Sequence, residues 1–396
     1  MPAHPEKKRI EILDIYRGFA VLGIFVVNIE IMNCIFMNQD SFSSQWNSFI
    51  DIIVVKILQL FFYSKFFPIF SFLFGLGITF QALKLIDSKG RSTAFFIRRM
   101  FVLFLLGVLH IFLLWPGDVI HLYAILGMFT ILLLKLPDRL ILISSLVILI
   151  FPFYEVIAEF IFQIIDYDAE TYLNNYSSTS IVETIRHGSY IEGMLLRISE
   201  YKANIPVLFV YLAPIAFSMF LLGMYFGKKK YIEHLKELIL KIKNPTLYIL
   251  IISNLYRISF LFWLPHTEIY RNTHWRPLFL KLMVVSDLLM GLGYLWILGY
   301  IWYYTKYSKT LNFFKYPGRM ALTNYILQSL IGLLLFSSVG LSLYETLSTL
   351  MTFSIAILTF VFQVFFSKIW LNHFQFGPLE WLWRCISYKK LLPIKR

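Results

Sequence analysis

Long apolar stretches separated by short polar connections run along almost the whole chain. About ten of them are long enough to cross a bilayer as an α-helix, because the hydrocarbon core of a membrane requires about 20 apolar residues. These stretches lie near residues 17–36, 66–86, 100–116, 118–135, 139–163, 205–227, 245–264, 279–304, 320–338 and 346–367. The pattern predicts an all-α fold, a polytopic transmembrane bundle of about ten spanning helices that forms a single domain over residues 1–396.

The composition agrees with a membrane protein. Hydrophobic residues make up 58% of the 396 residues and charged residues only 15%, whereas about a quarter of the residues in soluble domains are charged. A soluble fold could not bury so many apolar runs, so soluble classes are excluded. The polar start, MPAHPEKKRIEILDIYRG, has no small-residue cleavage site, so we expect the first run to remain as a helix. Cys34 and Cys385 match no metal or redox spacing.

The basic residues are unevenly distributed. If the amino terminus is cytoplasmic, 27 of the 36 Lys and Arg residues fall in cytoplasmic segments. The positive-inside rule therefore predicts that both termini lie in the cytoplasm. This placement explains the net charge of +13 without a nucleic-acid partner.

Two segments outside the apolar runs need separate interpretations. Residues 164–204 are polar and acidic and are expected to form an extracytoplasmic loop that caps an outer cavity. Residues 368–396 include the aromatic stretch IWLNHFQFGPLEWLWRCISY, which Gly377-Pro378 interrupts. This composition favours an interfacial or re-entrant segment over a further span.

The first apolar run, LDIYRGFAVLGIFVVN, carries polar residues on one side of the predicted helix. Arg17 and Asn28 are eleven residues apart, which places them about 20° from the same direction, and Asp14 lies on that side too. Polar groups that face lipid are costly, so this stripe should face protein or water. It indicates either part of a substrate pathway or an interfacial Asp14–Arg17 ion pair with Asn28 as a helix–helix contact.

The third run repeats this spacing in FIRRMFVLFLLGVLH. Arg99 and His110 are also eleven residues apart, and Arg98 and Arg99 lie at the predicted cytoplasmic end. We therefore expect Arg99 to line the cytoplasmic end of a cavity that contains His110.

A tight WPGD turn then returns the chain to the depth of His110. Asp118 lies in this turn, and His121 and Tyr123 open the next helix. A carboxylate beside a histidine can fix its tautomer and raise its basicity, so His110 with Asp118 predicts a general base. The alternative is a pair of polar groups that cap a helical hairpin. No metal site is expected, because the spacing of ligands required for a metal is absent.

Two more polar clusters lie in apolar surroundings. Lys65 stands at the mouth of the second apolar run, SKFFPIFSFLFGLG, whose Gly75 and Gly77 permit close helix contacts. Arg319 opens GRMALTNYILQSL, in which Asn324 and Gln328 share one face. Either cluster could line a substrate pathway, although interhelical hydrogen bonding is the favoured interpretation for Asn324 and Gln328.

Five stretches in order resemble a known family. LDIYRGFAVLGIFVVNI, KFFPIFSFLFGLGITF, LLGVLHIFLLWPGDVIHLYAILGM, GRMALTNYILQSLI and FGPLEWLWR together look like the YeiB-like bacterial membrane proteins of domain of unknown function 418. The resemblance extends from residue 10 to about 390. It implies a multi-pass protein of the bacterial cytoplasmic membrane.

The pattern LD..RG.A......N is also similar, more distantly, to the first helix of heparan-glucosaminide acetyltransferase-like and acyltransferase type 3 proteins. That similarity implies acyl-CoA as donor, and the FIRRM run resembles the arginine pair of the type 3 enzymes. By this similarity Arg98 and Arg99, with Arg17, would bind the phosphates of CoA. Asn28 occupies the position of the histidine proposed as catalytic in the type 3 enzymes. The heparan-type proteins have a histidine just before the second helix, where Lys65 is the nearest titratable group in this chain. The similarity therefore implies that His110 would be the base.

These inferences predict a membrane-embedded acyltransferase. It would move an acyl group from cytoplasmic acyl-CoA to a hydroxyl or amine of an extracytoplasmic small molecule, glycan or lipid, with membrane lipids as surroundings. The alternative is a transporter of a small anionic or amphipathic solute, for which the same polar residues would form the route. The oligomeric state is open, with a homodimer as one option.

Overall fold

The computed structural model describes residues 10–34, 42, 45–87, 93–151 and 153–396. Helices make up most of this part of the chain, and it contains no β-strand. The α-helices are α1 (Glu11–Asn33), α3 (Phe49–Phe61), α4 (Phe66–Asp87), α5 (Thr93–Leu113), α6 (Ile120–Leu132), α7 (Asp138–Ile150), α8 (Tyr154–Ile164), α9 (Ser178–His187), α10 (Tyr190–Ala203), α11 (Ile205–Val207), α12 (Ala213–Lys228), α13 (Leu235–Lys241), α14 (Lys243–Phe262), α15 (Glu268–Arg271), α16 (Arg276–Tyr304), α17 (Asn312–Arg319), α18 (Ala321–Phe336), α19 (Thr349–His373) and α20 (Pro378–Tyr388). The expected all-α class is confirmed.

The number of spans is smaller than the sequence pattern predicts. Seven helices in the described part are long and apolar enough to cross a membrane, and nine spans result if each of two bent pairs counts as one. The bent pairs are α7 with α8, at 80°, and α17 with α18, at 77°. The run expected at 118–135 forms only the short apolar segment Ile120–Lys135, so the count of ten is not confirmed.

Glycines allow the central helices to touch at their backbones. A Cβ atom on Gly75 of α4 would lie 2.4 Å from the carbonyl oxygen of Phe220, and one on Gly223 of α12 would lie 2.3 Å from that of Phe72. The pair α4–α12 therefore packs at a distance that side chains would prevent, as small residues do in membrane bundles. The expected close approach at Gly75 is confirmed.

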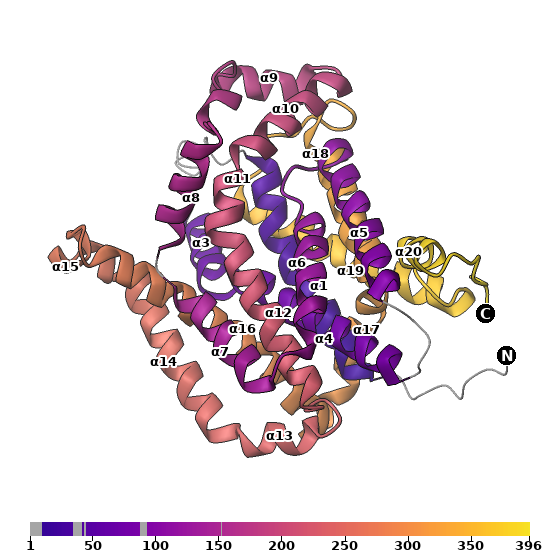
Figure 1. Ribbon diagram of the computed structural model, residues 1–396. Coiled ribbons are helices and arrows are strands. Elements are labelled where there is room, and N and C mark those ends of the chain that lie inside the picture. The colour runs from indigo at the N-terminus through magenta and orange to yellow at the C-terminus, as the bar shows by residue number, and fades with distance from the viewer. Residues whose placement is uncertain (1–9, 35–41, 43–44, 88–92, 152) are drawn as a thin grey trace.

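Two helical segments lie at opposite ends of the bundle. Helices α9 and α10 lie across one end, and α13 lies at the other, with α12 between them (Figure 1). The segment expected as a loop, 164–204, thus contains two short helices, each begun by a serine capping box at Ser177 or Ser189. Serine side chains at these positions accept hydrogen bonds from backbone N–H groups that have no partner within the first turn of the helix.

The carboxyl-terminal segment folds back beside α5 (Figure 1). Helix α19 continues to His373, and α20 begins at Pro378 directly after Gly377. The Gly-Pro pair therefore starts α20, because proline is compatible with the first turn of a helix. At 11 residues α20 is too short to span a membrane.

Candidate functional site

The turn between α5 and α6 holds a buried carboxylate between two histidines. Asp118 Oδ1 lies 2.9 Å from His110 Nδ1, and Asp118 Oδ2 lies 2.8 Å from His121 Nδ1 and 2.9 Å from the His121 backbone nitrogen. The side chains of Asp118 and His110 are fully buried, and that of His121 is 4% exposed. The expected proximity of His110 and Asp118 is confirmed, and His121 completes the group.

This arrangement determines how each ring is protonated. An ionised carboxylate only accepts hydrogen bonds, so both Nδ1 atoms donate to Asp118 and each Nε2 is left as an acceptor when the rings are neutral. The Tyr201 hydroxyl lies 2.9 Å from His121 Nε2 and donates to it. His110 Nε2 is buried and has no hydrogen-bond partner among the described residues. His110 is therefore oriented by Asp118 and has a basic nitrogen available.

A glycine that the sequence interpretation did not single out allows α6 to approach this group. A Cβ atom on Gly107 would lie 2.4 Å from the His121 backbone nitrogen and 2.8 Å from Asp118 Oδ2. Gly107 lies three residues before His110, so it is on the same side of α5. That spacing was the available signal in the sequence.

A cavity of about 730 Å³ adjoins the Asp118 group. Of the predicted site residues, Asn28 and Asp118 line it, whereas His110 and His121 do not. Residues from 184 to 204 line the same cavity from α9 and α10, including Tyr201, whose hydroxyl binds His121. The volume is within the range of small-molecule sites, about 300–1,000 Å³.

The carboxyl-terminal helix covers the arginine pair. The Arg99 guanidinium lies 3.6 Å from the centre of the Trp383 ring, and Trp383 Nε1 donates to the Arg99 carbonyl oxygen at 2.8 Å. Arg98 Nε donates to the carbonyl oxygen of Ser387 at 2.7 Å. Neither arginine lines the 730 Å³ cavity. The expectation that one cavity contains His110, Asp118 and Arg99 is wrong for this cavity, because only Asp118 of the three lines it. Arg99 is instead covered by Trp383 of α20.

The polar stripe of α1 is divided between two environments. Arg17 Nη1 lies 3.1 Å from Asp14 Oδ1, and Asp14 is almost fully buried, whereas the Arg17 side chain is 32% exposed. The expected ion pair is confirmed. Neither residue lines the cavity that Asn28 reaches, so the three residues do not form one continuous wall of it.

Lys65 stabilises a break in the long apolar segment Phe49–Leu83. Helix α3 ends at Phe61 and α4 begins at Phe66, and Ser64 between them has a φ of 62°. The break leaves backbone carbonyls without helical partners. Lys65 Nζ donates to the carbonyl oxygens of Tyr63 at 3.0 Å and Gln59 at 3.5 Å. Backbone carbonyl groups at membrane depth must accept hydrogen bonds from the protein, because lipid provides no donors there.

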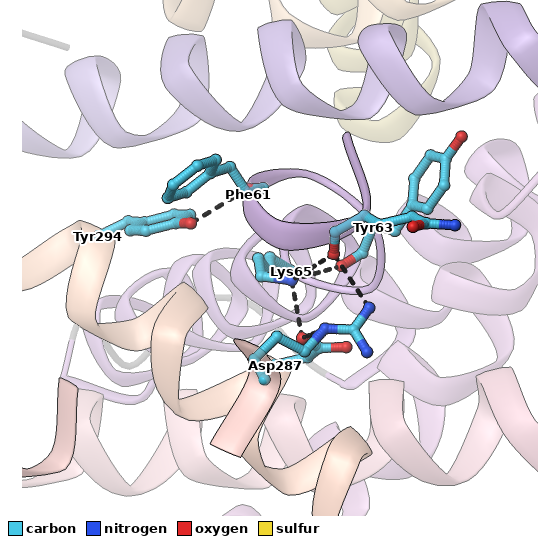
Figure 2. A network of polar contacts seen from close by, with 7 residues as sticks. Phe61, Tyr63, Lys65, Asp287 and Tyr294 are labelled. Carbon is cyan, nitrogen blue, oxygen red and sulfur yellow. Dashed lines mark hydrogen bonds and ion pairs between the residues drawn. The ribbon is translucent and has the colours of Figure 1, made fainter. Parts of the chain in front are cut away.

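Two further charges complete this network (Figure 2). Asp287 of α16 lies 2.7 Å from Lys65 Nζ and 3.1 Å from Arg257 Nε of α14. Arg257 also donates to the Gln59 carbonyl oxygen at 3.0 Å, and the Tyr294 hydroxyl donates to that of Phe61 at 3.1 Å. The sequence interpretation missed Asp287 and Arg257, although a single acid within the apolar 29-residue helix α16 was a detectable signal.

Asn324 and Gln328 hold helices together. Asn324 Nδ2 donates to Ser367 Oγ at 3.0 Å, and Gln328 Nε2 donates to Gln363 Oε1 at 2.9 Å. Gln363 in turn donates to the Asn324 carbonyl oxygen at 2.9 Å. Neither predicted residue lines the cavity, which agrees with interhelical hydrogen bonding between α18 and α19.

Tyr123 and Arg319 also lie away from the cavity. The Tyr123 hydroxyl lies 2.7 Å from Ser71 Oγ, and the ring stacks on Phe70, so Tyr123 is part of the core. Arg319 ends α17 and does not open the ninth apolar run, because that run begins at Ala321 after the 77° bend.

Comparison with known proteins shows a similarity to one family. Residues 226–390 match the family described as "Protein of unknown function (DUF418)". The chain is 27% identical to the Bacillus subtilis (strain 168) "Uncharacterized protein YxaH" over 98% of this chain and 96% of that protein. It is 26% identical to the Escherichia coli (strain K12) "Uncharacterized protein YeiB" over 96% of this chain and 97% of that protein. The chain is thus similar to the DUF418 family over residues 226–390. Its similarity to these two relatives extends over nearly its whole length, including the part that precedes residue 226.

Proposed function

We propose that this protein is a membrane-embedded acyltransferase that modifies a hydroxyl or amine bound in the 730 Å³ cavity. The observation that carries the proposal is Asp118, which lines the cavity and binds the Nδ1 atoms of two histidines. A carboxylate that fixes histidine tautomers is the arrangement that acyl transfer requires of a general base.

His110 does not itself line the cavity, so the proposed step requires the acceptor to enter past Asp118. His110 Nε2 then accepts the proton of the acceptor hydroxyl or amine. The oxygen or nitrogen then bonds to the acyl carbon, the bond from that carbon to the donor sulfur breaks, and the His110 imidazolium returns the proton to the leaving thiolate. Asp118 stabilises the imidazolium that forms. General-base assistance contributes about 10²–10⁴ in rate.

Acyl-CoA stays the proposed donor, with Arg98 and Arg99 as the proposed phosphate contacts. Because Trp383 covers Arg99, the donor site at this position requires α20 to leave α5. Arginine would then bind phosphate through two parallel N–H groups.

The proposed location is the bacterial cytoplasmic membrane, with both termini in the cytoplasm and residues 164–204 outside. The distribution of basic residues supports this orientation. The positions of α9–α10 and α13 at opposite ends of the bundle also support it (Figure 1). Labelling from outside should modify a cysteine introduced at Ser177 and leave one introduced at Lys229 unmodified. The opposite result would reverse the orientation.

The enzymatic proposal is tested with purified protein in liposomes, radiolabelled acetyl-CoA, and extracted envelope lipids and glycans as acceptors. His110→Gln should lower acetyl transfer by about 10²–10⁴-fold. His187→Gln, at an exposed position of α9, serves as the matched control and should keep wild-type transfer. Equal thermal stability of the two variants would show that His110→Gln remains folded. Normal transfer by His110→Gln would refute the catalytic role.

One observation favours transport as a second candidate. The Phe49–Leu83 segment is broken at Lys65, and Tyr63 and Ser64 of the break line the cavity. Broken helices with buried charges form the substrate sites of many secondary transporters. Wild-type protein that takes up a solute into liposomes and transfers no acetyl group would favour this candidate.

A further inference from the structure

The 730 Å³ cavity combines polar and apolar lining. Polar groups gather where α10 covers it, at Ser189, Arg197, Glu200 and Tyr201, and α1 and α18 add Asn28, Glu30 and Ser329. Apolar residues of helices α1, α12, α16 and α18 form much of the remaining wall. This combination suits an amphiphile better than a uniformly polar solute, because an apolar chain gains about 25 cal/mol for each Å² removed from water.

Arg197 is the basic residue among the described residues that line this cavity. It is 8% exposed, its Nε donates to the Phe112 carbonyl oxygen at 3.1 Å, and its guanidinium lies 5.1 Å from the centre of the Tyr190 ring. Its Nη2 atom is buried and has no hydrogen-bond partner among the described residues. A guanidinium has five N–H donors and is always charged, so a buried one without a carboxylate partner is costly.

The acidic residues of the cavity do not provide that partner. Both oxygens of Glu30 accept hydrogen bonds, one from the Tyr63 hydroxyl and one from the Thr349 hydroxyl. Asp118 accepts hydrogen bonds from His110 and His121, and the ion pairs of the described residues do not include Arg197.

Glu200 lies three residues from Arg197, on the same side of α10. Burial raises the pKa of the Glu200 carboxyl to about 7, an effect that the positive charge of Arg197 only partly offsets. No ion pair joins Glu200 to Arg197 among the described residues, so the guanidinium of Arg197 remains available to a ligand.

The geometry points to Arg197 as the binding site for the phosphate of an amphiphile whose apolar chain lies along α12 and α16. Phosphate is the anion that a bilayer supplies already attached to apolar chains, and an arginine fork matches two of its oxygens. The inference rests on the proposed function only in taking this cavity as the acceptor site. It narrows the acceptor to a phosphate-containing lipid.

Binding to the purified full-length protein in neutral detergent tests the inference. Three probes are compared. Dioleoylphosphatidylglycerol carries both the apolar chains and the phosphate, dioleoylglycerol carries only the chains, and glycerol 3-phosphate carries only the phosphate. Binding is measured by native mass spectrometry and by the rise in melting temperature. Wild-type protein should bind the phospholipid at least 10-fold more tightly than either partial probe.

Arg197→Gln should lose that preference and bind dioleoylphosphatidylglycerol at least 10-fold more weakly, with unchanged binding of dioleoylglycerol. Arg271→Gln is the matched control, because Arg271 is exposed on α15 and, among the described residues, its ion pair is with Glu268. Arg197→Lys keeps the charge without the fork and should lose an intermediate amount, which preserves the test if Arg197→Gln fails to fold. Equal phospholipid binding by Arg197→Gln and wild type would overturn the inference, as would glycerol 3-phosphate binding as tightly as the phospholipid. Because no turnover is measured, failure here is distinct from failure of the His110 test.

Discussion

Removing Asp287 should destabilise the protein more than removing Lys65, although the two residues form one ion pair. The group contains two cations, Lys65 and Arg257, and one anion, Asp287. Lys65→Met leaves Arg257 paired with Asp287, so the buried charges balance. Asp287→Asn leaves two buried cations side by side without a carboxylate. The charge balance of the wild-type group thus predicts the order of the two effects.

The magnitudes follow from the contacts that each substitution removes. Lys65→Met leaves the Tyr63 carbonyl oxygen without its 3.0 Å donor, and an unsatisfied buried acceptor costs about 1–3 kcal/mol. Removal of one partner from a buried pair costs about 3–5 kcal/mol, which is the expected loss for Asp287→Asn. Lys281→Met is the matched control, because Lys281 is on the same helix as Asp287 and donates to a backbone carbonyl oxygen, that of Phe151 at 3.3 Å. We expect that control to lose about 1 kcal/mol.

The assay is equilibrium unfolding of each purified variant in mixed micelles, followed by intrinsic fluorescence and repeated by thermal aggregation. The free energy of unfolding should fall in the order wild type, Lys281→Met, Lys65→Met and Asp287→Asn. A Lys65→Met loss equal to or larger than the Asp287→Asn loss would refute the reasoning, because it would mean that the carbonyl contacts of Lys65 outweigh the charge balance.

Three further changes probe other parts of the structure. Gly107→Ala should destabilise the protein by about 1–3 kcal/mol, the usual cost of overpacking, because the added Cβ atom would lie 2.8 Å from Asp118 Oδ2. If this variant unfolds and transfers acetyl groups like the wild type, the close approach at Gly107 is contradicted. Trp383→Ala removes the ring 3.6 Å from the Arg99 guanidinium and should raise acetyl-CoA affinity if α20 covers the donor site, whereas a lowered affinity would place CoA elsewhere. Glu200 has a pKa raised from 4.5 to about 7 by burial, so its neutral form favours folding below pH 4.5 and this advantage is lost as the pH rises through 7. At 1.36 kcal/mol per pKa unit the loss is at most ~3.4 kcal/mol, and melting temperatures at pH 5 and pH 8 should differ less in Glu200→Gln than in wild type.

The amino-acid sequence by itself determined the class of fold and the contacts between near neighbours. Apolar runs predict helices because each backbone N–H and C=O in lipid must be satisfied within its own segment. Asp14 and Arg17 pair because residues three apart meet on one helix face. His110 and Asp118 meet because the turn between α5 and α6 is short, so eight residues suffice to bring them within 2.9 Å.

The break at Lys65 and the cover over Arg99 depended on the tertiary structure. Lys65 and Asp287 are 222 residues apart, and Arg99 is 284 residues from the tryptophan that covers it. Helical periodicity predicts which face of a helix a side chain occupies, but which other helix meets that face depends on where glycines permit close crossing, as Gly75 and Gly223 do between α4 and α12. The cavity beside Asp118 also depended on this packing, because α10 contributes Arg197 to its wall only after α9 and α10 fold across the end of the bundle (Figure 1).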